Sequence, residues 1–90
     1  MIRDRTNPLD PETLALAALG WTLAQEDRAQ RLLALTGLAP ADLRDRLGEP
    51  AVLAAILGFL EAHEPDLVGC AEALAVGPGE LIEARRRLEA

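Results

Sequence analysis

The chain has 90 residues, half of them hydrophobic, which is enough for one domain with one core and too few for two. Leu and Ala dominate, with one Phe, one Trp and no Tyr, which favours helices and excludes a fold rich in strands. Nine arginines stand against fifteen acidic residues, and the resulting net charge of −6 disfavours nucleic acids and anionic membranes as partners.

Prolines stand at the starts of apolar segments, where a helix loses no internal hydrogen bond to them. Glycines expected to end helices follow three of the segments, at Gly37, Gly48 and Gly77. Together these signals predict six helices, over residues 11–25, 27–36, 40–47, 50–63, 65–75 and 78–89. The fold class is therefore all-α: a compact bundle of five to six short helices, packed orthogonally. We expect a flexible N-terminal arm over residues 1–9 and a single helical domain over residues 10–90.

The first predicted helix carries the longest apolar run, eleven residues from Leu14 to Ala24. That length is too short to cross a bilayer as a helix. Asp10 and Glu12 precede the run, where a helix N-terminus attracts acidic side chains and a secretory signal carries none. No membrane association is therefore expected.

The predicted helices differ in how they should sit in the bundle. Those over 11–25 and 50–63 are apolar on almost every face and are expected at its centre. The helix over 27–36 is amphipathic and is expected outside. It should turn Arg28, Gln30 and Arg31 to water, and Ala29, Leu32, Leu33 and Leu35 towards the core.

The stretch FLEAHEPDLVGC contains the one histidine and the one cysteine, His63 and Cys70, which raises the question of a thiol or metal site. Cys70 lies on the apolar stripe of its predicted helix, which indicates a buried cysteine rather than a reactive thiolate. The spacing of the two residues matches no paired zinc ligands. A thiol or metal site at His63 and Cys70 remains the least favoured alternative, and no metal is expected.

The same stretch is better interpreted as a structural joint between two helices. His63 is expected to cap the end of the fourth helix through its imidazole, and Glu64 to turn the chain because it precedes Pro65. Asp66 then lies at the positive N-terminal end of the next helix.

The C-terminal segment, residues 71–88, has the outline of a DNA-binding helix-turn-helix, with Arg85, Arg86 and Arg87 as candidate contacts. A recognition helix presents its N-terminal residues to base edges, and here those residues are Glu80 and Glu83. A structural helix pair therefore fits better, and nucleic acid is not the expected partner.

Between Leu19 and Leu74 the chain carries LALTGL, then ADLR shortly after it, and HEPDL behind an apolar helix. With these motifs the region resembles a family of small bacterial proteins, domain of unknown function 3572. The resemblance implies an all-helical fold and brings no activity, cofactor or partner, so it transfers no site residue.

The residues themselves favour an interaction function. The chain lacks Ser, Lys and Tyr, and with them three common catalytic groups, so we expect neither an enzyme nor a bound cofactor. Its one cysteine cannot form an internal disulfide, which fits the cytoplasm. The leading hypothesis is a protein-interaction or regulatory domain whose partner is another protein or a second copy of the chain. The alternative is a DNA-binding regulator that uses residues 71–88.

Overall fold

The computed structural model describes residues 10–90, and the expected N-terminal arm over residues 1–9 lies outside the described residues. Between Asp10 and Ala90 the chain forms six helices and no strand: α1 (Pro11–Leu23), α2 (Glu26–Thr36), α3 (Pro40–Asp45), α4 (Pro50–Glu61), α5 (Glu64–Leu74) and α6 (Pro78–Glu89). The predicted all-α class is confirmed, and each predicted helix boundary lies within two residues of the observed one.

The helices begin where the prolines predict. Proline is the first residue of α1, α3, α4 and α6 and the second residue of α5. Asp10 caps α1, because its Oδ2 accepts hydrogen bonds from the Thr13 amide and hydroxyl, each at 3.0 Å. These hydrogen bonds hold the pKa of the Asp10 carboxyl below its usual value.

The helix ends match the prediction less well. Gly37 ends α2 in the left-handed conformation, with φ 77°. Gly48 was expected to end the third helix, and that prediction is wrong, because α3 ends at Asp45 with Arg46 as its C-cap residue and Gly48 has no positive φ. Gly77 was expected to end the fifth helix, and that prediction is also wrong. Ala75 takes the left-handed conformation there, with φ 60°, and the Val76 amide donates to the Ala71 carbonyl at 3.0 Å. Gly77 instead precedes α6 as its N-cap residue.

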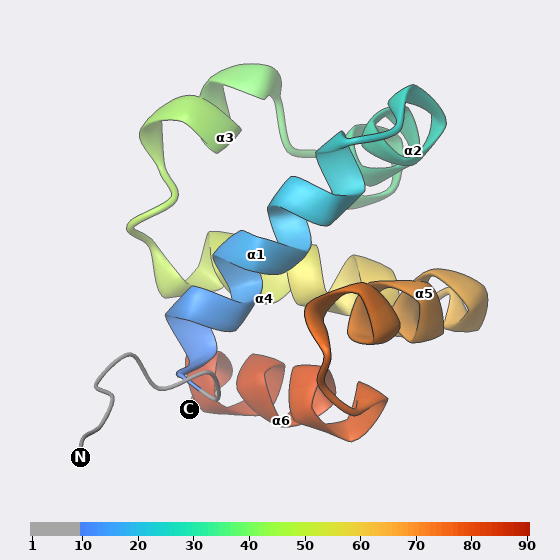
Figure 1. Cartoon of the computed structure of the whole chain (residues 1–90). Coiled ribbons are helices and arrows are strands. Elements are labelled where there is room, and N and C mark those ends of the chain that lie inside the picture. The colour runs from blue at the N-terminus through green and yellow to red at the C-terminus, as the bar shows by residue number, and fades with distance from the viewer. Residues whose placement is uncertain (1–9) are drawn as a thin grey trace, which may run out of the picture.

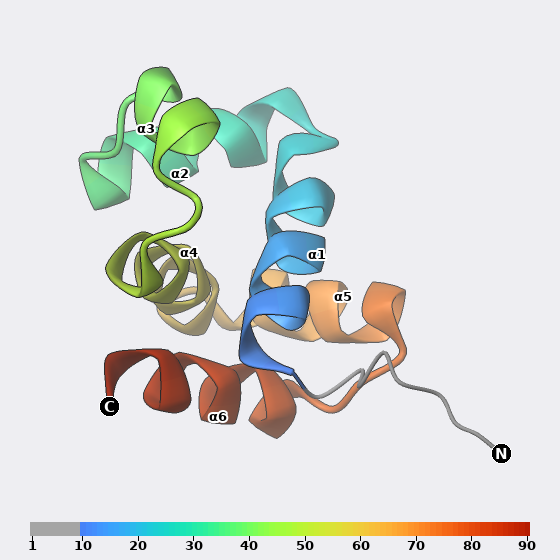
Figure 2. The ribbon, with the colours of Figure 1, turned by 90° about the vertical axis from the view of Figure 1, so that its left-hand side faces the viewer.

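The bundle is built around α4, which packs against α6, α1, α5 and α2. Figure 1 shows α1 crossing in front of α4. Figure 2 shows α4 nearly end-on while α1 runs up the view and α6 runs across it, so the central helices pack at steep angles. Seven of the twelve residues of α4 are buried, which confirms its predicted central place.

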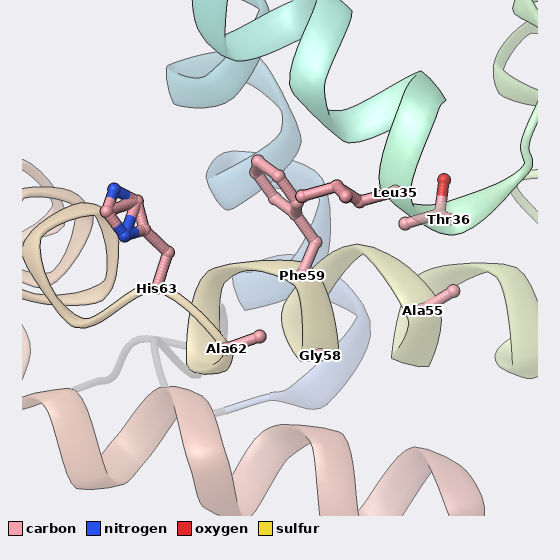
Figure 3. A pocket seen from close by; sticks show the side chains of 7 residues that line it. All are labelled: Leu35, Thr36, Ala55, Gly58, Phe59, Ala62 and His63. Carbon is pink, nitrogen blue, oxygen red and sulfur yellow. The ribbon is translucent and has the colours of Figure 1, made fainter.

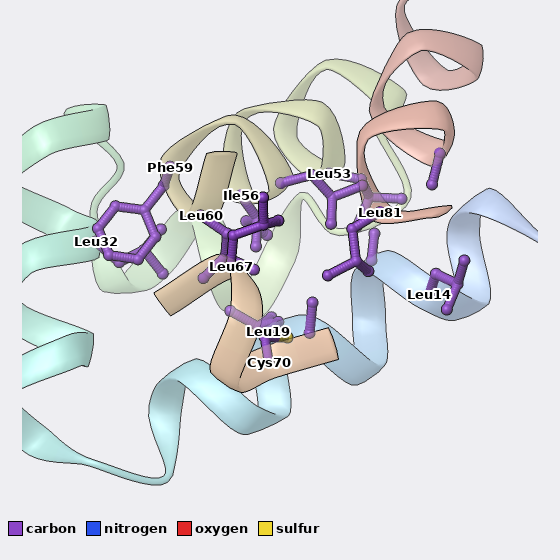
Figure 4. Packing of buried hydrophobic residues seen from close by; sticks show 14 of the residues in the cluster. Leu14, Leu19, Leu32, Leu53, Ile56, Phe59, Leu60, Leu67, Cys70 and Leu81 are labelled. Carbon is purple, nitrogen blue, oxygen red and sulfur yellow. The ribbon is translucent and has the colours of Figure 1, made fainter. Parts of the chain in front are cut away.

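One contiguous core joins five of the six helices (Figure 4). It consists mainly of Leu with small Ala side chains between them, and Phe59 is its one buried aromatic residue. The largest fully buried side chains are Leu32, Leu53, Ile56, Leu57, Leu60, Cys70 and Leu81, together with Thr22. None of the described helices is both long and apolar enough to span a membrane.

Candidate functional site

A groove opens between α2 and α4, on the side of α4 that faces away from α1 (Figure 3). It holds about 330 Å³ and is lined by Leu35, Thr36, Ala55, Gly58, Phe59, Ala62 and His63. The two polar side chains stand at opposite ends in Figure 3, and everything between them is hydrocarbon or glycine. The Thr36 hydroxyl already donates to the Leu32 carbonyl at 2.6 Å. The groove is therefore an apolar surface and carries no set of catalytic groups.

Leu35 forms the rim of this groove and is 73% exposed. The prediction that it faces the core is wrong. Leu32 is the one residue of α2 that is buried, so the contact between α2 and the core is narrow. Leu35 lies about 60° around the helix from Leu32, which carries it past that contact and into solvent.

His63 and Cys70 are not brought together. Cys70 is fully buried in the core, and burial raises the pKa of its thiol to about 11, with a smaller opposing effect from Arg28. His63 is exposed beside the groove, and about 10 Å of helix axis separates the two positions. Among residues 10–90, no three His, Cys, Asp or Glu side chains cluster as metal ligands would.

Between α4 and α5 the chain turns at His63, and backbone hydrogen bonds of His63 hold the turn. His63 is extended, with φ −134°, and its carbonyl accepts from the amides of Asp66 and Leu67 at 3.0 and 3.1 Å. Its imidazole makes no hydrogen bond to any described residue, so the expected side-chain cap is not formed; backbone amides close the end of α4 instead. Glu64 is already the first residue of α5, which places the turn one residue earlier than expected.

Asp66 has a partner that the sequence pattern did not indicate. It is buried, and its Oδ2 accepts a hydrogen bond from Arg31 Nη1 at 2.8 Å. This ion pair ties α2 to α5. Arg31 also lies 5.9 Å from the centre of the Phe59 ring, so its charge is held at the protein surface and not fully in solvent.

Arg28 is likewise not a solvent-facing residue. Its guanidinium carbon lies 3.6 Å from the centre of the Trp21 ring, and its Nη2 donates to the Trp21 carbonyl at 2.6 Å. That carbonyl belongs to the last turn of α1, where a cation favours the negative helix end. The six-membered ring of the indole lies against Gly69 of α5, where an added Cβ would be 3.2 Å from Cζ2 of Trp21. This Arg28–Trp21 stack joins three helices.

The three arginines of α6 do not form one basic patch. Arg85 Nε and Nη2 donate to the two Glu61 carboxylate oxygens, at 2.5 and 3.3 Å, and its Nη1 donates to Glu89 at 2.6 Å. Arg86 lies 3.8 Å from Glu83, while Arg87 is exposed. Glu80, at the N-terminal end of this helix, accepts a hydrogen bond from the Gly77 amide at 2.9 Å and so caps it. Arg85 is thus engaged in holding α6 to α4.

Comparison with known proteins agrees with the resemblance seen in the sequence. No curated protein and no solved structure matches the chain. A family model does match, over residues 9–90, and its description is "Protein of unknown function (DUF3572)". Because this match covers nearly the whole chain, the protein belongs to the DUF3572 family.

Proposed function

We propose that this domain is a non-enzymatic protein-interaction module that binds apolar side chains of a partner helix in the groove between α2 and α4. The observation that carries the proposal is the position of Leu35, which leaves a large apolar side chain in solvent at the rim of an apolar groove. An amphipathic helix laid into such a groove would cover Leu35 and fill the space above Phe59.

The size and lining of the groove suit inserted apolar side chains of a partner. At about 330 Å³ it lies near the lower end of the range of ligand sites, about 300–1,000 Å³. Its floor includes Ala55, Gly58 and Ala62, whose small size leaves room for larger apolar side chains of a partner. Binding would thus rest on a few apolar anchors in a water-excluding pocket.

The charge pattern defines the partner further. Residues 32–41 and 50–60, which supply most of the groove lining, contain no charged side chain. The chain as a whole carries a net charge of −6. A partner helix should therefore have an apolar face for the groove and basic residues on either side of it, because these speed encounter with an acidic protein.

The test compares proteins captured from a lysate of the source cells by the wild type, by Leu35→Glu and by Val68→Glu. Val68 is the matched control, because it is an exposed apolar residue of α5 outside the groove. We expect at least one protein to be captured by the wild type and the control and lost with Leu35→Glu. With that protein purified, Leu35→Glu should raise the Kd at least about tenfold, a loss of roughly 1.4 kcal/mol.

Two results would overturn the proposal. One is that the same proteins are captured by all three forms. The other is that the purified partner binds wild type and Leu35→Glu with equal Kd. Since Leu35 is 73% exposed, its substitution should leave the melting temperature unchanged, so a loss of binding is not a loss of fold.

A further inference from the structure

The chain around α3, residues 38–48, is attached to the domain differently from the other helices, and we call it the α3 segment. No residue from Gly37 to Ala51 is buried, and α3 is the described helix that adds no buried side chain to the core. The segment meets the core through three partly buried leucines: Leu38, Leu43 and Leu47. Its attachment is therefore apolar and shallow.

The polar contacts of the α3 segment are all local. Within residues 10–90, its hydrogen bonds and ion pairs reach no further than Thr36 on one side and Glu49 on the other. Arg46 contacts Asp42 and Glu49 at 3.0 and 2.9 Å. Asp42 also accepts a hydrogen bond from the Ala39 amide at 2.8 Å. The segment can therefore leave the core without losing a hydrogen bond or an ion pair to a distant helix.

The α3 segment lies where the groove ends. Figures 1 and 2 show α2 and α3 on the same side of α4, with α2 over the C-terminal half of α4 and α3 over its N-terminal half. Thr36 and Ala55 form the end of the groove opposite His63 (Figure 3). Val52 stands one turn before Ala55 on α4 and is 3% exposed. The groove thus stops where α4 passes under the α3 segment.

We infer that the α3 segment is a lid, which opens as a unit while the other five helices stay folded and so lengthens the groove along α4 as far as Val52. Segments with few buried apolar contacts open locally far more often than the core does. Gly37 precedes the segment and Gly48 ends it, and these two residues are its hinges.

The lid sets the length of helix that the groove accepts. With the lid closed, the groove follows α4 from Ala55 to His63, about 12 Å of helix axis; with the lid open, it begins at Val52 and extends to about 16 Å. A partner that needs the longer groove binds the open form, so its apparent Kd is the intrinsic Kd divided by the open fraction. This regulatory role rests on the proposed function of the groove, whereas the opening itself does not.

Thiol labelling tests the opening without any partner. Val52→Cys places a thiol under the lid, and the native Cys70, which is fully buried in the core, is the internal reference. In excess iodoacetamide and without denaturant, the thiol at position 52 should react at least about 100-fold faster than Cys70, because it needs only the lid to open. Ala54→Cys is the matched control. Ala54 is 4% exposed but lies about 200° around α4 from Val52, so a thiol there should react as slowly as Cys70.

Two further substitutions separate local from global opening. Leu43→Ala removes one of the three leucines that hold the lid and should speed labelling at position 52 at least about tenfold. Ala84→Gly weakens α6 in the core, away from the lid, and should speed labelling of Cys70 about tenfold. It should leave the rate at position 52 unchanged, because the closed and open forms lose the same stability.

Hydrogen exchange of the wild type gives an independent measure that needs no substitution. The amides of Leu43 and Arg46 donate to the Ala39 and Asp42 carbonyls inside the segment. They should share one protection factor, at least about 100-fold below that of amides in the middle of α4. Protection equal to that of α4 would overturn the lid. So would a thiol at position 52 that reacts as slowly as Cys70, or one that Ala84→Gly speeds as much as Cys70. Failure to find a partner would overturn the proposed function of the groove and leave these rates unaffected.

Discussion

Arg31 and Asp66 are 35 residues apart in sequence, yet Arg31 Nη1 donates a hydrogen bond to Asp66 Oδ2 at 2.8 Å and ties α2 to α5. The Asp66 side chain is 12% exposed and the Arg31 side chain 40% exposed, so water screens the pair only in part. A double-mutant cycle with Arg31→Ala and Asp66→Ala should give a coupling free energy of about 1 kcal/mol, at the upper end for surface pairs.

Urea unfolding followed by far-UV circular dichroism measures this coupling. The control cycle is Arg44→Ala with Asp45→Ala, a largely exposed pair separated by 3.9 Å, for which we expect no measurable coupling. Equal coupling in the two cycles would contradict the assignment of Arg31 and Asp66 as a structural tie between helices.

This ion pair also shows why the site was harder to predict than the helices. Proline at a helix start is a local signal, so the boundaries could be predicted within two residues. Hydrophobic periodicity assigns a residue to the inner or outer face of its helix, but it does not say how wide a face the neighbouring helix covers. Arg31 was therefore expected in water, although its partner lies on α5.

The groove was hard to predict for the same reason. It arises because α2 contacts the core through little more than Leu32, a property of how two helices cross. From sequence, Leu35 continues the apolar stripe and is indistinguishable from a core residue. The sequence gives one indication of the groove, because residues 32–41 and 50–60 contain no charged side chain. A buried helix has the same property, so this pattern does not distinguish a core from a binding surface.

Ala75 is the one non-glycine residue between Asp10 and Ala90 with positive φ, at 60°. This conformation costs an L-residue about 1 kcal/mol, and glycine avoids the cost. Ala75→Gly should therefore raise the free energy of unfolding by about 1 kcal/mol and the melting temperature by roughly 4–8 °C.

The matched control lies two residues earlier. Ala73 is an exposed residue inside α5 with ordinary helical geometry, so Ala73→Gly should lower the free energy of unfolding by about 1 kcal/mol. Thermal melts of the two variants should thus shift in opposite directions. A shift of the same sign in both would mean that Ala75 does not carry the backbone strain.

Trp21, the one tryptophan of the chain, reports on the position of Arg28. Arg28→Ala removes the guanidinium 3.6 Å from the ring centre and the hydrogen bond to the Trp21 carbonyl. We expect a loss of about 1–2 kcal/mol in the free energy of unfolding, together with a changed tryptophan emission spectrum in the folded state.

A second arginine separates this effect from a general loss of positive charge. Arg46 contacts Asp42 and Glu49 on the surface around α3 and does not stack on an aromatic ring within the described residues. Arg46→Ala should leave the emission spectrum unchanged. An unchanged spectrum in Arg28→Ala as well would show that the guanidinium does not rest on the indole in solution.

Ionisation of Cys70 should lower the stability of the fold at alkaline pH. Its thiol is fully buried, and burial raises its pKa from 9.0 to about 11. The folded state therefore keeps the proton to a higher pH than the unfolded chain, and the stability present below pH 9 is lost as the pH rises to about 11. The difference of about two pKa units corresponds to a loss of up to roughly 3 kcal/mol.

The sequence makes the cause of that loss testable. The chain has no Lys and no Tyr, and Arg titrates above pH 12, so Cys70 is the one side chain that ionises between pH 9 and 11. Cys70→Ala should lower stability at neutral pH by about 1 kcal/mol through the small cavity that it leaves, and should flatten the alkaline decline. Urea titrations at successive pH values measure both effects. An equally steep decline in the variant would mean that the thiol is not the titrating group, and that its burial in the core is incomplete in solution.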